Sequence, residues 1–141
     1  MPMLDSYLFF SGRCAEAMRF YEQTLGGKLE AVMTYGDSPD PQACTAGAKD
    51  LVMHASLLID GRRLMASDAP PEHPTPPMGG FSLSLQYTGA QEARRIFDAL
   101  SQGGEVRMPM QKTFWAETFG MLTDRFGVAW AVNGAPIQFR K

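Results

Sequence analysis

The chain has 141 residues, of which 45% are hydrophobic and 20% charged, so it is long and apolar enough to fold without a metal or disulfide. Thirteen basic and fifteen acidic residues give a formal net charge of −2 without a basic stripe, which excludes the electrostatic footprint of a nucleic-acid-binding protein. There is no apolar run of membrane-spanning length and no basic start of a signal peptide, so we expect a cytoplasmic protein that does not bind membranes.

The first half of the chain predicts one strand, one helix and three further strands. Apolar residues recur at helical spacing from Cys14 to Leu25, where Gly26-Gly27 provides a stop signal. Asp60-Gly61 is a strong signal for a hairpin turn between two strands. The expected elements are a strand at 7–10, the helix at 14–25, and strands at 28–35, 51–59 and 62–67, with a loop at 36–50 before the hairpin.

The second half repeats this order of elements. Residues 81–87 alternate between apolar and polar side chains, the period of a half-buried strand. A helical repeat from Ala90 to Leu100 follows and ends at Gly103-Gly104. The remaining expected elements are strands at 105–108, 119–123 and 127–133, with a turn at 124–127.

A proline-rich segment, 69–77, separates the two halves and cannot form a helix or a central strand. We therefore expect a single α+β domain over 1–141, made of a βαβββ module at about 5–68, a linker at 69–79 and a second module at about 80–134. One sheet with one helix leaves a sheet face bare, so the two mixed, curved sheets should form a cleft that serves as the ligand site.

Four stretches in this order resemble a known family. Phe20-Tyr21 with Leu25-Gly26-Gly27 resembles the first-helix signature of the vicinal-oxygen-chelate superfamily, which includes glyoxalases, bleomycin-resistance proteins and ring-cleaving dioxygenases. The stretches 65–69 (MASDA), 113–116 (TFWA) and 123–130 (TDRFGVAW) resemble its PhnB-like (YjdN-type) branch. The resemblance extends from about Leu8 to Asn133 and implies the paired βαβββ fold and a homodimer.

This branch often carries a ubiquinone methyltransferase label, which the sequence does not support. A nucleoside-type methyl donor usually needs a glycine-rich turn between a first strand and a helix. The corresponding turn here, Ser11-Gly12-Arg13, has one glycine.

Enzymes of the superfamily hold a divalent metal with four side chains, and the resemblance places these positions on Ser6, Met65, Phe81 and Ala131. Three of the four have no suitable nitrogen or oxygen donor. We therefore expect neither the usual metal nor another cofactor. A metal site built instead from His54, Asp68 and Glu117 is the alternative.

Four polar or aromatic residues are candidates for the ligand pocket: His54, Asp68, Trp115 and Glu117. His54 is either a hydrogen-bonded structural residue of its strand or a pocket residue, and Asp68 either stabilises the turn after its strand or points into the pocket. Trp115 and Glu117 lie in the expected loop before the seventh strand. Trp115 either forms an aromatic wall for a flat ligand, or packs at the end of the core or in a dimer contact.

The leading functional hypothesis is a protein that binds a small, partly apolar molecule without the usual metal. The alternative is a metal-dependent lyase or dioxygenase of glyoxalase type with non-standard ligands, and a third possibility is a structural or regulatory dimer without a ligand. Cysteine catalysis is not expected, since Cys14 lies on the apolar helix face and Cys44 has no histidine beside it in sequence.

Overall fold

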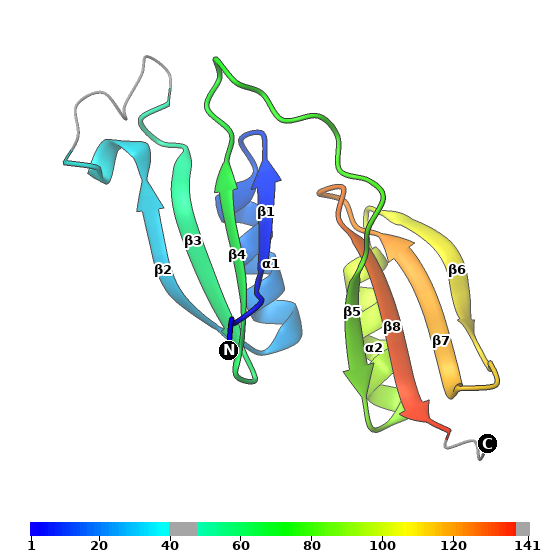
Figure 1. Ribbon diagram of the computed structural model, residues 1–141. Coiled ribbons are helices and arrows are strands. Elements are labelled where there is room, and N and C mark those ends of the chain that lie inside the picture. The colour runs from blue at the N-terminus through cyan, green and yellow to red at the C-terminus, as the bar shows by residue number, and fades with distance from the viewer. Residues whose placement is uncertain (40–47, 138–141) are drawn as a thin grey trace. The chain divides into compact units, whose positions relative to one another are not determined.

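The computed structural model describes residues 1–39 and 48–137 and divides the chain into two compact units, Met1–Pro76 (unit 1) and Pro77–Lys141 (unit 2) (Figure 1). Each unit has the order strand, helix, strand, strand, strand, and its strands form one four-stranded mixed sheet. The predicted α+β class with two βαβββ modules is therefore confirmed. No helix in the described ranges is long and apolar enough to cross a membrane, and Cys44 lies outside these ranges.

Unit 1 has the strand order β1-β4-β3-β2, with β1 parallel to β4 and the other pairs antiparallel. The Asp60-Gly61 hairpin prediction is confirmed, since both residues have positive φ angles of 46° and 81° between β3 and β4. The elements are β1 (Ser6–Phe10), α1 (Cys14–Leu25), β2 (Lys28–Thr34), the short 3₁₀ helix η1 (Tyr35–Asp37), β3 (Val52–Ile59) and β4 (Arg62–Asp68).

Unit 2 has the strand order β5-β8-β7-β6. Its elements are β5 (Leu83–Tyr87), α2 (Ala90–Ser101), β6 (Glu105–Gln111), β7 (Ala116–Thr123) and β8 (Ala129–Pro136). One prediction is wrong, because Glu117 lies inside β7 and not in the loop before it. The strand β6 also runs through Pro109, which an edge strand tolerates because its outer N–H groups need no partner.

In each unit the helix packs on one face of the sheet, and no element described in that unit covers the other face (Figure 1). On α1, the residues Ala17, Met18 and Tyr21 are fully buried against this sheet face. Burial of each large apolar side chain contributes about 1.5–3 kcal/mol, so this layer supplies the hydrophobic core of the unit. Alternate residues on each strand must then point to the uncovered side.

The two Gly-Gly pairs end the helices and also allow a close approach to a strand. Gly26 adopts the left-handed conformation at the end of α1, with φ of 79°, and Gly103 has φ of 75° after α2. A Cβ atom on Gly27 would lie 2.5 Å from the carbonyl oxygen of Leu58, and one on Gly104 would collide with that of Thr123. In each pair, the first glycine provides the turn and the second provides the space.

Asp68, at the end of β4, connects four segments of unit 1. Its Oδ1 accepts hydrogen bonds from the backbone N–H of Gly12 (2.8 Å) and Cys14 (3.0 Å), and its Oδ2 accepts one from Val52 N–H (2.9 Å). The N-cap residue of α1, Arg13, provides no side-chain cap, so the Asp68 carboxylate fulfils that role at the positive end of the helix. Burial and the charge of Asp68 raise the pKa of the Cys14 thiol to about 12.

We predict that Asp68→Ala lowers the free energy of unfolding by about 3 kcal/mol, because it leaves the buried N–H groups of Cys14 and Val52 and the part-buried N–H of Gly12 without their acceptor. Asp68→Asn should cost about half as much, since an amide oxygen still accepts at Oδ1 whereas the NH₂ group cannot accept from Val52. Urea denaturation followed by circular dichroism measures both values.

Asp37→Ala is the matched control, because it removes an exposed carboxylate whose hydrogen bonds are to the backbone and side chain of a single residue, Thr34. It should cost no more than about 1 kcal/mol. Equal costs for Asp68→Ala and Asp37→Ala would contradict the structural role of Asp68.

Candidate functional site

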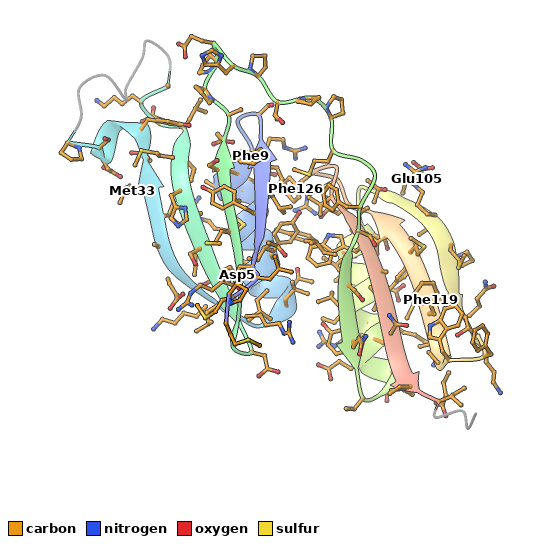
Figure 2. All side chains as sticks on the ribbon, in the orientation of Figure 1. Asp5, Phe9, Met33, Glu105, Phe119 and Phe126 are labelled. Atoms are coloured by element: carbon orange, nitrogen blue, oxygen red, sulfur yellow. The ribbon has the colours of Figure 1, made fainter. Side chains whose placement is uncertain are left out.

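The uncovered face of the unit 1 sheet carries large apolar side chains from β1, β4 and β2. Tyr7 and Phe9 are 39% and 51% exposed, whereas Leu8 and Phe10 between them are 4% and 3% exposed against α1. Met65 of β4 pairs with Tyr7 and belongs to the same row. Figure 2 labels Phe9 on β1 and Met33 on β2, the two edge strands of this sheet. This surface, the unit 1 open face, is broad and mostly apolar.

A phenol and an imidazole are hydrogen-bonded on the unit 1 open face. The Oη atom of Tyr7 lies 3.1 Å from Nδ1 of His54, and their rings lie 5.7 Å apart. The Tyr7 ring also lies 5.2 Å from that of Phe9. Because imidazole can either donate or accept at Nδ1, the pair can reverse its hydrogen bond and offer a donor or an acceptor to a bound molecule.

Ser56 lies on the same face as His54, two residues along β3, and pairs with Met65. Its hydroxyl is buried without a hydrogen-bond partner, and the residue is only 7% exposed. An unpaired buried hydroxyl costs about 1–3 kcal/mol, and such a group in a native protein needs an explanation. A bound ligand atom that hydrogen-bonds the hydroxyl would provide one.

Polar side chains lie near both ends of β4. Near its start, Arg63 Nε donates to Glu30 Oε1 at 3.0 Å. At its end, the Tyr35 hydroxyl donates to the backbone oxygen of Asp68 at 2.8 Å. Burial, followed by the charges of Asp68, Tyr7 and Glu72, raises the pKa of Tyr35, so this phenol remains a neutral donor.

Unit 2 has a pocket of about 380 Å³ between the segment that precedes β5 and the strands β6 and β7. Met78, Phe81 and Met121 provide apolar lining, and Arg107 and Thr123 provide polar groups. Arg107 Nε donates to Thr123 Oγ1 at 3.2 Å.

An aromatic cluster lies at the start of β7 in the same unit. The indole N–H of Trp115 donates to Asn133 Oδ1 at 3.0 Å, and its ring makes edge contacts with Phe119 at 5.2 Å and Phe114 at 4.8 Å. Trp115 is 36% exposed and Phe114 is 74% exposed. Glu117 lies two residues after Trp115 and two before Phe119, so the exposed Glu117 shares a strand face with Phe119.

The four predicted site residues therefore fall into three places. His54 lies on the unit 1 open face, whereas Asp68 is buried on the opposite, helix-covered side and binds backbone N–H groups. Trp115 and Glu117 lie two residues apart in unit 2, at the start of β7. The sequence reasoning missed Tyr7 and Ser56, although strand alternation with His54 would have placed Ser56 beside it.

The positions that hold the superfamily's metal carry few suitable donors in this chain. Ser6 pairs with Leu64, whereas its neighbour Tyr7 pairs with Met65 on the open face. Phe81 precedes β5, and Ala131 lies in β8. The thioether of Met65, the phenyl ring of Phe81 and the methyl group of Ala131 are not ligands of a divalent metal of this kind. Within residues 1–39 and 48–137, no group of three His, Cys, Asp or Glu could hold a metal ion. The residues present do not fit the superfamily metal.

Comparison with known proteins places the chain in a family. The sequence profile of the Glyoxalase/Bleomycin resistance protein/Dioxygenase superfamily matches residues 3–132. Protein YjdN of Escherichia coli (strain K12) is 37% identical over 94% of this chain and 95% of its own length.

Two solved structures extend this comparison. The protein PA1353 from Pseudomonas aeruginosa is 49% identical with a TM-score of 0.88, over 95% of this chain and 98% of its own. The Bacillus cereus PhnB protein, described as a putative 3-demethylubiquinone-9 3-methyltransferase, is 26% identical with a TM-score of 0.76, over 95% of this chain and 100% of its own. The chain belongs to the glyoxalase/bleomycin resistance protein/dioxygenase superfamily and has PhnB-like and YjdN-like relatives.

Proposed function

We propose that this protein is a cytoplasmic binding protein that holds a small, partly apolar molecule through its own side chains and without a chelated metal. One observation carries the proposal: the buried, unpaired hydroxyl of Ser56 lies beside the Tyr7–His54 hydrogen bond on a mostly apolar sheet face. Ligand sites typically combine an apolar lining with a few converging polar groups.

The chemistry of the unit 1 open face defines the kind of ligand. Phe9 and Met65 offer apolar contact, and the flexible, polarizable side chain of Met33 adapts to an irregular or aromatic shape. Tyr7, His54 and Ser56 can together donate and accept hydrogen bonds within a small area. A ring or short alkyl group with a hydroxyl or carbonyl substituent fits this combination.

The side chains at the family's metal positions and the turn after β1 argue against the other activities associated with this family. A glyoxalase-type lyase or dioxygenase needs nitrogen and oxygen ligands where this chain has Met65 and Ala131. The FosX protein of Listeria monocytogenes, whose mutant is described in complex with Mn(II), is 10% identical, and this likeness concerns the fold alone. Methyl transfer has no support either, because Gly12 and Cys14 already donate their N–H groups to Asp68 in the turn where a methyl donor would bind.

We predict that p-cresol binds the unit 1 open face and shifts the NMR signals of ¹³C-labelled methionine methyl groups at Met33 and Met65. Tyr7→Phe and His54→Gln should each weaken binding by about 0.5–1.5 kcal/mol, the net value of a neutral hydrogen bond. Ser56→Ala should weaken binding similarly while it raises the stability of the free protein, because it removes an unsatisfied buried hydroxyl.

Thr118→Val is the matched control, because the Thr118 hydroxyl is also buried without a partner but lies in β7 of unit 2. It should leave p-cresol binding unchanged. The ether 4-methylanisole, which cannot donate a hydrogen bond, should bind more weakly than p-cresol. Methyl shifts confined to other methionines, or unchanged affinity in all three unit 1 variants, would contradict the proposed site.

We also propose that the protein forms a homodimer, as its family resemblance implies. Exposed residues of unit 2 such as Phe114 and Val106 leave apolar surface available for a second copy. Trp115 is not needed for a polar contact across this interface, since Asn133 already satisfies its indole N–H within unit 2.

Sedimentation equilibrium should give twice the chain mass of 15.5 kDa for the wild type. Trp115→Ala should keep this mass and most of the stability, because the side chain is partly exposed. A monomeric wild type would contradict the dimer, and a monomeric Trp115→Ala variant would make Trp115 an interface residue.

A further inference from the structure

We propose that the pocket of unit 2 binds a small organic anion, with Arg107 and Thr123 at its acid group and Met78, Phe81 and Met121 around its apolar part. All of these residues lie in unit 2. The inference is therefore independent of the binding site proposed on unit 1.

Arg107 lines the pocket and is hydrogen-bonded to its neighbour on the adjacent strand. Arg107 projects from the edge strand β6, and its Nε atom donates to Thr123 Oγ1 on β7. Because Thr123 accepts this bond, its own hydroxyl proton is available to donate. The guanidinium group and this hydroxyl can thus donate to one carboxylate or similar acid group, an arrangement for which the planar arginine fork is well suited.

The charge of the pocket favours an anion. Arg107 is the charged residue that lines it, and the other lining side chains are apolar or neutral. Glu105 approaches Arg107 only to 3.7 Å, and both side chains are more than half exposed, at 67% and 58%. Such an exposed and long ion pair contributes little and would exchange readily for a ligand acid group held against apolar walls.

The volume limits the size of the ligand. About 380 Å³ lies near the lower end of the range of small-molecule pockets, which extends from about 300 to 1,000 Å³. Two flexible methionines and one aromatic ring suit a single ring or a short alkyl chain that carries one acid group.

The test uses phenylacetate and its neutral analogue 2-phenylethanol as probes, with ¹³C-methyl methionine NMR of the full chain as the readout. Met78→Leu and Met121→Leu assign the two pocket signals. We expect phenylacetate to shift both signals and to bind more tightly than 2-phenylethanol. Arg107→Gln should raise the dissociation constant of phenylacetate by about tenfold, whereas that of 2-phenylethanol should hardly change.

Arg94→Gln is the matched control, because Arg94 is an exposed residue of α2 and its substitution changes the net charge by the same amount as Arg107→Gln. It should leave phenylacetate binding intact, and Thr123→Val should weaken it by a smaller factor than Arg107→Gln. The proposal is overturned if phenylacetate leaves the Met78 and Met121 signals unshifted. It is equally overturned if Arg107→Gln binds like the wild type, or if the two arginine variants lose affinity alike.

Discussion

The carboxylate of Asp68 is the interaction on which the unit 1 fold most depends. It joins the turn after β1, the first turn of α1 and the start of β3 to the end of β4, through three backbone N–H groups. In unit 2, Asp124 plays a comparable local role, since it accepts from Phe126 N–H, Val128 N–H and the Trp130 indole. Each buried carboxylate replaces hydration with several hydrogen bonds, and removal of such an acceptor is costly.

This structural use of Asp68 also determines where chemistry can occur. With α1 held against one face of the sheet, strand alternation directs Tyr7, His54 and Ser56 to the other face, away from the Asp68 carboxylate. His54 and Asp68 therefore cannot share a ligand on this sheet. The alternative metal set of His54, Asp68 and Glu117 thus lacks the Asp68 carboxylate. What remains on the open face is a hydrogen-bonding group of donors and acceptors between apolar side chains.

Much of the fold could be predicted from the sequence, because its signals are local. The helical spacing from Cys14 to Leu25, the Gly-Gly stops and the Asp60-Gly61 turn each predict an element that the structure contains. Strand ends were harder to predict: the sequence predicts a strand from Phe119, whereas β7 begins at Ala116 and includes Glu117. The candidate site was predicted only in part. The Tyr7–His54 bond joins residues 47 positions apart, and the unpaired Ser56 hydroxyl depends on its neighbours from other strands, neither of which a local pattern reveals.

The central claim is that binding uses protein side chains and not a chelated metal. Isothermal titration of p-cresol into the protein, before and after exhaustive dialysis against a chelator, tests this claim most directly. The account predicts the same dissociation constant in both titrations, and no gain when Mn²⁺, Ni²⁺, Fe²⁺ or Zn²⁺ is added back. Binding that disappears with the chelator and returns with one stoichiometric divalent metal would contradict it.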